Sequence, residues 1–449
     1  MSDKVTLKEK ISYALVNLGN IPIQTILGSY LLIFYTNIVG LSPASCATLF
    51  LIARVLDGLN DPFVGFAIDH IPTTKHGHFR PTLVVGSILC ALNFLLLWFG
   101  PLMATSGKLA IAYVSYLLIG VLFPVMDISL NSMLPVMTTD MEERNMLSSL
   151  KGVVYMVGMF GLNMIAPIII GNTTEAAGYI RLVIFVTIIV VVFSVVGAVG
   201  LKERVTQQPG DSKYKLKDLF KILVQRPVIV TFLSSLAYMI GMSVTNTMLA
   251  YFFTYVIGNL SLISVVSLVQ LIALIPASLL VGKLIQKFGK KKLYAFGVIA
   301  VGVIPLIRLI DVTNVPILMI ATIAGGFASG LCMPLSYGIQ ADNTDYVNLK
   351  MNVHAEAAVA ALSSFITKCA MGIGGAIPGY MLAAVGFDSA AAQQPDGVKT
   401  VIIIGAIVIP AVLGILGSII FAGAYPLTKE KLEAQAAEMK AVREKNASL

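Results

Sequence analysis

Three charged residues lie close together in an apolar stretch near the start of the chain. The stretch Phe50–Arg80 carries Asp57 and Asp61, with Arg54 three residues before the first of them. At 3.6 residues per turn, these three side chains share one face of a helix. A charged side chain at the centre of a bilayer costs about 2.5–3.5 kcal/mol on insertion scales, so it faces a partner or a cavity and commonly marks an ion path.

An ion pair between Arg54 and Asp57 that only fixes helix packing is the alternative interpretation. Because one arginine cannot neutralise two aspartates, the site would still be acidic. A third acid, Asp127, is the only one in the apolar stretch Leu109–Val136. Three carboxylates in apolar helices cannot all stay ionised without a bound cation or proton. The pattern therefore predicts a cation-binding site made of Asp57, Asp61 and Asp127, with Arg54 in its charge network.

Amide side chains follow one face of the first apolar stretch. Asn17, Asn20 and Gln24 stand at positions i, i+3 and i+7, and each amide both donates and accepts hydrogen bonds. Such a stripe suits the hydroxyl groups of a sugar, and polar contacts between helices are the alternative interpretation. The other polar residues that we expect at a substrate site are Asp127, Asn131, Lys151, Ser364 and Lys368.

Lys368 lies in an apolar stretch of the second half of the chain. An unpaired ammonium group is costly in the membrane, so we expect this lysine to pair with a carboxylate or with an anionic group of the substrate. A purely structural role, as the counter-ion of Asp57 or Asp127, is the alternative interpretation.

Composition places all of these residues in a membrane protein. Of the 449 residues, 57% are hydrophobic and 12% are charged, with a mean hydropathy of +0.88, whereas about a quarter of the residues of a soluble protein are charged. Runs of about 20 apolar residues span a bilayer as helices. We expect an all-α polytopic protein with twelve such helices, at Ile11–Val39, Leu41–Ile68, Pro81–Met103, Leu109–Val136, Met146–Ile170, Ile180–Leu201, Pro227–Val256, Leu260–Ile285, Leu293–Ile310, Pro316–Tyr337, Ala355–Val385 and Val401–Ala424.

The positions of lysine and arginine predict the orientation in the membrane. Of the 31 basic residues, 25 fall in the termini and connections on one side and four on the other. Positively charged segments resist translocation, so we expect both termini to be cytoplasmic, in a plasma membrane such as the bacterial inner membrane. The net charge of +8 then reflects topology, and we expect no nucleic-acid partner.

The longest interruption between apolar stretches divides the chain into halves. We expect an N-terminal six-helix bundle at 1–201, a cytoplasmic loop with an interfacial helix at 202–226, a C-terminal six-helix bundle at 227–424 and a cytoplasmic tail at 425–449. Short basic turns with glycine follow both the second and the eighth helix, a repeat typical of transporters with two equivalent halves. The single tryptophan, Trp98, is expected to be an interfacial anchor.

Several runs of sequence resemble the glycoside-pentoside-hexuronide:cation symporters of the major facilitator superfamily. They are YALVNLGN, YLLIFYTNIVGL, ARVLDGLNDPFVGFAIDHIPTTKHGHFRP, VMDISLNSMLP and ADNTDYVNLKMNVHAEAAVAALSSFITK. The most specific part is the loop after the second helix, with Asp69, Lys75, Gly77 and Arg80. The resemblance implies the major facilitator fold, a coupling cation on Asp57 and Asp61, Asp127 between the cation and sugar sites, and Lys368 near the substrate.

The function expected from these features is cation-coupled symport of a sugar or glycoside by alternating access, by a monomer in the lipid bilayer. Pro124 stands where the family has a threonine of its sodium site, so a proton is favoured over sodium or lithium. No phosphate-binding loop, nucleophile elbow or His/Cys cluster indicates an enzyme, a cofactor or another metal. A membrane sugar sensor without transport, and a carrier of an amphipathic non-sugar substrate, are the alternatives.

Overall fold

The fold is described from a computed structural model of the 449-residue chain. It describes residues 5–438 apart from 70, 73, 76, 139, 172, 174, 205–220, 352–355, 390, 392–393 and 436–437. For a further set of residues it describes the backbone alone: 55, 58–59, 61–63, 65–66, 69, 135, 141–142, 144–145, 356–358, 360–361 and 396.

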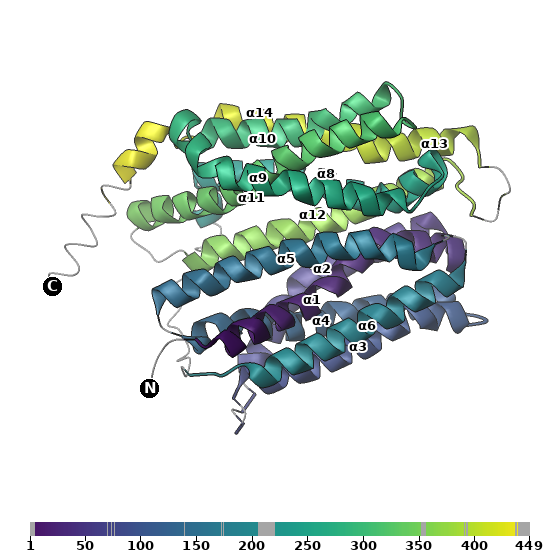
Figure 1. The fold of residues 1–449 in the computed structure, drawn as a ribbon, viewed down its shortest axis with the longest axis horizontal. Coiled ribbons are helices and arrows are strands. Elements are labelled where there is room, and N and C mark those ends of the chain that lie inside the picture. Colours follow the sequence, from purple (N-terminus) through teal and green to yellow (C-terminus); the bar gives the residue numbers. More distant parts are fainter. Residues whose placement is uncertain are drawn as a thin grey trace. The chain divides into compact units, whose positions relative to one another are not determined.

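Helices follow one another along the described chain (Figure 1). In the first half they are α1 (Leu7–Phe34) with its π-helical continuation η1 (Tyr35–Val39), α2 (Pro43–Asp69), α3 (Phe79–Met103), α4 (Lys108–Met137), α5 (Met141–Ile170) and α6 (Ala176–Gly200). In the second half they are α8 (Arg226–Tyr251) with η2 (Phe252–Ile257), α9 (Leu262–Phe288), α10 (Lys290–Val303) with η3 (Ile304–Leu309), α11 (Val315–Met351), α12 (Glu356–Ala384), and α13 (Asp396–Ile403) continuing through η4 (Ile404–Val408) into α14 (Ile409–Ala424). With each continued helix counted once, these are the twelve expected segments in the expected order.

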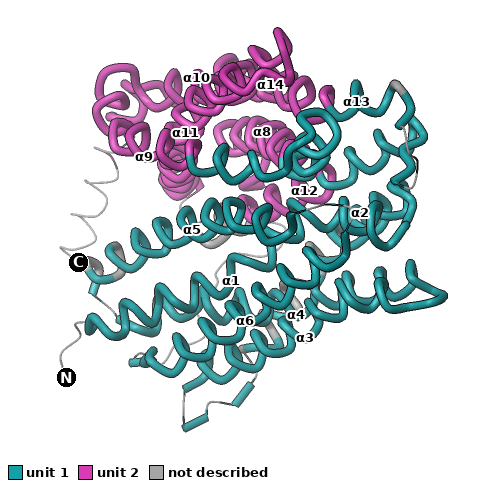
Figure 2. The backbone as a smooth tube through the Cα atoms, turned by 45° about the vertical axis from the view of Figure 1, so that its right-hand side comes forward, with its two compact units in different colours: residues 1–210, 246–268, 375–402 teal, residues 211–245, 269–374, 403–449 magenta. Residues whose placement is uncertain are grey.

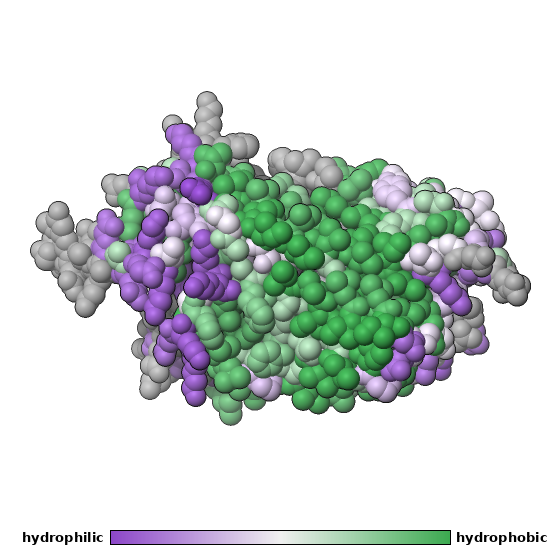
Figure 3. Space-filling view, turned by 90° about the horizontal axis from the view of Figure 1, so that it is seen from above, coloured by the Kyte–Doolittle hydropathy of each residue, from purple (hydrophilic) through white to green (hydrophobic). Residues whose placement is uncertain are grey.

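The outer surface suits a bilayer. Among the described residues, ten helical segments are long and apolar enough to cross a membrane, and α2 and α12 complete the set of twelve. Hydrophobic residues cover the middle of the face drawn in Figure 3, with hydrophilic residues gathered toward its ends. Side chains such as Leu279 and Ile310 are 79% and 78% exposed, which is favourable only where lipid replaces water.

The chain forms two compact units (Figure 2). Unit 1 contains 1–210, 246–268 and 375–402, and unit 2 contains 211–245, 269–374 and 403–449. Unit 1 therefore holds the helices of the first half together with the last turns of α8, with η2, with the first turns of α9, with the end of α12 and with nearly all of α13. The two bundles expected from the sequence, 1–201 and 227–424, stay a prediction.

Within unit 1, α1 packs against α6 through small residues. A Cβ atom added at Gly197 would lie 2.4 Å from Val16 Cγ2, and one added at Gly19 would lie 2.5 Å from Ser194 Oγ. Small residues let helix backbones approach closely in a membrane, where dispersion contacts replace the hydrophobic driving force. The first helix thus lies close against the sixth at two positions along their length.

Crossed helix caps join α3 and α6 at one end of unit 1. We call it the basic end; α1 begins there and α2 and α4 finish there. The Glu203 carboxylate accepts backbone N–H bonds of 2.8–2.9 Å from His78, Phe79 and Arg80 at the start of α3. The Arg80 guanidinium in turn donates to the carbonyls of Ala198 and Val199, both at 3.0 Å, at the end of α6. The negative Glu203 thus caps the N–H groups at the start of α3, and the positive Arg80 caps the carbonyls at the end of α6. Both charges are also favourable to the helix dipoles.

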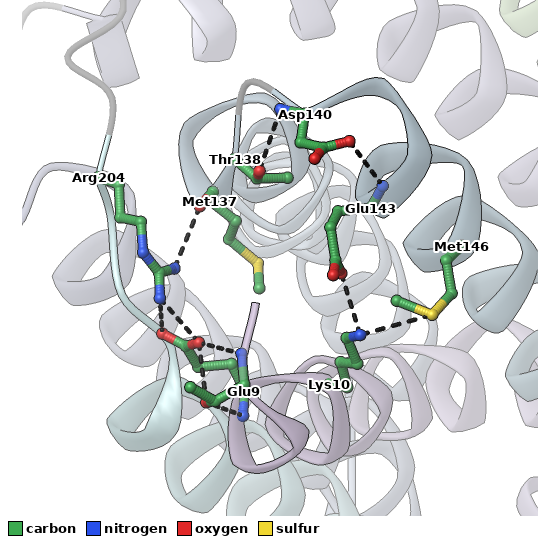
Figure 4. A network of polar contacts seen from close by, with 9 residues as sticks. Glu9, Lys10, Met137, Thr138, Asp140, Glu143, Met146 and Arg204 are labelled. Carbon is green, nitrogen blue, oxygen red and sulfur yellow. Dashed lines mark hydrogen bonds and ion pairs between the residues drawn. The ribbon is translucent and has the colours of Figure 1, made fainter. Parts of the chain in front are cut away.

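Further ion pairs tie α1 to its neighbours at the basic end (Figure 4). Arg204 donates to Glu9 Oε1 at 2.8 Å and to the Met137 carbonyl at 3.1 Å. The adjacent Lys10 forms an ion pair of 3.0 Å with Glu143 of α5. The start of α1 is thus fixed to α4, α5 and the chain after α6.

Unit 2 contains an equivalent contact. Lys291, at the start of α10, donates to the Tyr425 carbonyl just after α14 at 2.7 Å, as Arg80 does between α3 and α6. The neighbouring Lys290 binds both oxygens of Asp342 of α11, at 2.7 and 2.8 Å. The repeat seen in the two basic turns thus extends to the contacts that the turns make.

Two expectations about local structure have different outcomes. The prediction of an interfacial role for Trp98 is wrong: the indole is 0% exposed and lies 4.7 Å from the Phe34 ring and 6.2 Å from the Tyr179 ring. Packing between α1, α3 and α6 gives this large ring more contacts than a membrane surface would. The predicted interfacial helix falls largely on 205–220, which lies outside the described residues, as does the tail at 439–449.

We predict that Gly77→Ala lowers the thermal stability of the purified protein. Gly77 has φ +104°, and an added Cβ would lie 2.4 Å from Glu203 Oε1. The substitution therefore strains the backbone and displaces the α3 cap, at an expected loss of about 1–3 kcal/mol. Gly282→Ala, inside α9 with no atom within 4 Å of its added Cβ, is the matched control. Equal melting temperatures for the two variants would contradict the cap.

Candidate functional site

An arginine links the first two helices in the interior of unit 1. Arg54 of α2 donates to Asp57 Oδ2 at 3.2 Å, and both side chains are 13% exposed. Its second nitrogen lies 3.5 Å from Gln24 Oε1 of α1. The ion pair considered as the alternative is thus formed, and it connects directly to one residue of the predicted amide stripe.

Asp57 lies against α4 because Gly120 leaves room for it. A Cβ added at Gly120 would lie 1.9 Å from Asp57 Oδ1, so no other residue type fits without moving the carboxylate. One turn along α2, Asn60 donates to the Gly120 carbonyl at 3.1 Å. Neither Gly120 nor Asn60 was a candidate from the sequence. Asn60 could have been predicted, because it shares the helix face of Asp57, whereas nothing in the sequence singles out Gly120.

Asp127 is the centre of a second set of contacts. Its Oδ1 accepts a bond of 2.7 Å from Asn20 of α1, and its Oδ2 accepts one of 2.9 Å from Asn131 of α4. Lys151 donates to Asn131 Oδ1. Lys151 lies within α5, ten residues after Met141. The contacts therefore run across three helices, from Asn20 to Lys151.

The two sets lie at successive levels along the same helices. Gly120 and Asp127 are seven residues apart on α4, or about 10 Å along the axis at 1.5 Å per residue. Gln24 and Asn20 are one turn apart on α1, in the corresponding direction. The backbone of Asp61 is one turn beyond Asp57, toward the basic end, and its side chain lies outside the described residues.

The other predicted residues are placed as follows. Asn17 is 4% exposed and donates to the Tyr13 carbonyl of its own helix at 2.7 Å. Ser364 and Lys368 are one turn apart on α12, in unit 2. Lys75 is exposed in the turn before α3, and the Asp69 side chain lies outside the described residues. The roles of these residues stay predictions.

The contacts define what the site can do chemically. A carboxylate has about four lone-pair positions. In Asp127, the Asn20 amide occupies one position on Oδ1 and the Asn131 amide occupies one on Oδ2. Further lone pairs remain for a cation or a hydroxyl donor, while the Lys151 ammonium supplies a donor. Among the residues whose side chains are described, no group of three or more His, Cys, Asp and Glu could hold a metal ion. Such groups can bind polar solutes reversibly.

Apolar helices long enough to cross a membrane, with partly buried carboxylates and amides inside unit 1, are typical of membrane transporters. The chain belongs to the MFS/sugar transport protein family, whose profile matches residues 12–429. It is accordingly a carrier and not an enzyme, and its fold is that of the major facilitator superfamily, with two six-helix bundles.

Individual relatives agree with this family. The chain is 30% identical over 408 residues to the isoprimeverose transporter of Lactiplantibacillus pentosus, a match covering 88% of this chain and 84% of the relative. It is 29% identical to a candidate glycoside/cation symporter, YagG, of Escherichia coli (strain K12), covering 96% and 94% of the two chains. The structure of a D-xylose-proton symporter superposes with a TM-score of 0.64 at 14% identity, over 94% of this chain and 98% of that one; this likeness concerns the fold.

We predict that Gly120→Ala destabilises the protein by about 1–3 kcal/mol, the usual cost of overpacking a filled interior. Thermal unfolding of the purified protein measures the loss. Gly161→Ala on α5, whose added Cβ meets no atom within 4 Å, should be neutral. The loss should shrink when Asp57→Ala is also present, because the clash partner is then gone. A loss that is the same in both backgrounds would mean that Gly120 does not hold Asp57 in place.

Proposed function

We propose that the protein is a symporter that couples the uptake of a sugar or glycoside to the entry of a cation, by alternating access. The observation that carries the proposal is the paired arrangement of Arg54–Asp57 and Asn20–Asp127 contacts on α1, α2 and α4. Charged and amide groups at this depth mark solute and ion paths. The names of the relatives, an isoprimeverose transporter and a candidate glycoside/cation symporter, support the same class of substrate.

The cation site is Asp57, Asp61 and Asp127, with no other cofactor. A proton is favoured over sodium or lithium because Pro124 replaces a hydroxyl ligand of the family. Arg54 opposes protonation of Asp57, since the ion pair favours the ionised carboxylate, and this keeps sodium as the competing cation. A proton gradient and a sodium gradient should therefore differ in their effect on uptake.

The residues that we propose for substrate binding carry amide, hydroxyl, carboxylate and ammonium groups. Sugar hydroxyls both donate and accept hydrogen bonds, and the set contains acceptor carboxylates, two-way amides and donor ammonium groups. Its members are Asn17, Asn20, Gln24, Asp127, Asn131, Lys151, Ser364 and Lys368. A monomer in the lipid bilayer is sufficient for this site, with both termini on the cytoplasmic side and the bundles 1–201 and 227–424 rocking about it.

Coupling to a cation changes what the carrier can accomplish. One positive charge moving inward gains about 2.3 kcal/mol per 100 mV. At about 1.4 kcal/mol per factor of ten, this concentrates a neutral sugar about 50-fold. A uniporter reaches equal concentrations only.

We predict that Asp57→Asn and Asp61→Asn abolish gradient-driven accumulation and leave part of the substrate exchange, because the cation loses its ligands while the sugar contacts remain. Accumulation and counterflow of a radiolabelled glycoside in reconstituted vesicles measure the two activities. Full accumulation by both variants would reject the cation site.

We predict that an imposed proton gradient alone drives uptake in such vesicles. Addition of the glycoside should then make the medium outside inward-transporting vesicles more alkaline, since protons enter with the sugar. Stimulation by sodium or lithium alone would replace the proton by a metal cation. Uptake indifferent to every cation would reject symport.

We predict that Asn20→Ala weakens substrate binding about 5- to 150-fold, because Asp127 loses a buried partner worth ~1–3 kcal/mol. Asn17→Ala is the comparison. The Asn17 amide donates to its own helix, so its loss should cost less. Isothermal calorimetry with the glycoside that gives the largest thermal stabilisation in a sugar panel measures both. Unchanged binding in both variants and in Gln24→Ala would place the substrate elsewhere.

A further inference from the structure

A seven-residue pattern occurs at the end of the first helix of each half of the chain. Residues 34–40 read FYTNIVG and residues 252–258 read FFTYVIG. Both segments share phenylalanine, an aromatic residue, threonine, two aliphatic residues and a final glycine at matched positions. In the structure, both are π-helical, as η1 and η2. π-Helical turns are rare and are frequent at functional sites.

The two segments also end in the same way. Gly40 has φ 79° and ψ 28°, and Gly258 has φ 78° and ψ 12°, the left-handed conformation that favours glycine. The N–H of Gly40 bonds to the Tyr35 carbonyl, and the N–H of Gly258 bonds to the Phe253 carbonyl. The segments are therefore one local structure formed twice.

Within unit 1, side-chain hydrogen bonds join the first segment to the second segment and to Tyr251, the residue just before it. The hydroxyls of Thr36 and Tyr251 lie 2.6 Å apart, and Asn37 donates to the Tyr255 hydroxyl at 2.7 Å. Thr36 is 2% exposed and Tyr251 is 0% exposed. The Thr36–Tyr251 bond is thus shielded from water, and a hydroxyl left without its partner there is costly.

Residues of the chain just after α12 close over this pair. Ser389 donates to the Thr36 carbonyl at 2.7 Å. The Phe387 ring makes edge contacts with the Tyr251 and Tyr255 rings, at centroid distances of 5.6 and 5.4 Å. All of these contacts lie at the end of α1 opposite to the basic end.

The position of these contacts in the chain gives them a meaning for transport. Tyr251, Tyr255 and Phe387 belong to the second half of the sequence, yet they lie in the compact unit built from the first half. In a carrier whose halves rock against one another, contacts between the halves at one end form in one state and break in the other. The hydrogen bonds of Thr36 and Asn37 are contacts of this kind.

We propose that the paired π-helical ends, joined by Thr36–Tyr251 and Asn37–Tyr255, are the latch that closes the transport path on the side opposite to the termini. The proposal rests on the transport function proposed above. Opening of the path on that side requires both hydrogen bonds to break, so the tyrosine hydroxyls bias the equilibrium between the two access states. Polar contacts that hold helices together permanently would not have this effect.

The test measures access to the interior and needs no substrate. Gln24→Cys is introduced after replacement of Cys46, Cys90, Cys332 and Cys369 by serine, and a membrane-impermeant maleimide is applied from each side of oriented vesicles. Tyr251→Phe and Tyr255→Phe each remove one latch hydroxyl. Labelling from the side opposite to the termini should rise about 2- to 10-fold, the effect of one hydrogen bond on an equilibrium.

Tyr30→Phe is the matched control. Tyr30 is buried in the same unit, and its hydroxyl has no hydrogen-bond partner among the described residues, so its removal should leave labelling unchanged. Unchanged labelling in both latch variants would overturn the proposal. An equal rise in Tyr30→Phe would overturn it too, since the effect would then come from loosened aromatic packing.

A crosslink provides a second, independent measurement. The Asn37–Tyr255 bond is made at the tip of the long tyrosine side chain, so cysteines at these positions are too far apart for a direct disulfide. A reducible bifunctional thiol crosslinker on Asn37→Cys/Tyr255→Cys should stop labelling of the interior from that side, and thiol reduction should restore it. The pair Asn93→Cys/Ser115→Cys joins α3 and α4 within the first bundle, where Asn93 donates to the Ser115 carbonyl at 2.9 Å, and its crosslinking should have no effect. Continued labelling of the crosslinked latch pair would contradict the proposal. Because labelling is independent of sugar and cation, failure of symport leaves these results readable.

Discussion

The cost of charge in an apolar medium is the constraint on which the interior of this protein depends. Arg54 and Asp57 neutralise each other on α2, and Asp127 receives an amide on each oxygen. Unpartnered, each of these groups would oppose insertion of its helix. Partners on the same helix and on a neighbouring helix remove much of this penalty. In the proposed function, binding and folding use one set of residues.

These contacts exist because backbones come close together. Gly120 admits the Asp57 carboxylate to the surface of α4, and Gly197 brings α1 against α6. At the basic end, Glu203 and Arg80 hold α3 and α6 together by their backbone groups. Contacts between backbones and helix ends therefore position the helices, and the polar side chains of the interior are not needed for that task alone.

The spacing of residues predicted the helices and the shared face of Arg54 and Asp57, because both follow from periodicity within one segment. It did not identify which amide of the first helix meets Asp127, since Asn17 and Asn20 have the same chemistry and differ only in their neighbours. Trp98 was misjudged for the same reason: burial depends on helices distant in sequence. The repeat at Thr36 and Thr254 was visible in the sequence, but its meaning depended on backbone geometry.

The π-helical form of η1 and η2 has a consequence for change in this sequence. A π-helical turn accommodates one residue more than an α-helical turn, and each residue rotates a helix by about 100°. A single deletion within 35–39 or 252–257 can therefore be absorbed as an ordinary α-helix, at the expense of turning the following side chains away from their partners. Both segments can thus lose a residue and remain helical. A change in the length of either segment is therefore a route by which descendants of this chain can strengthen or weaken the contacts between them.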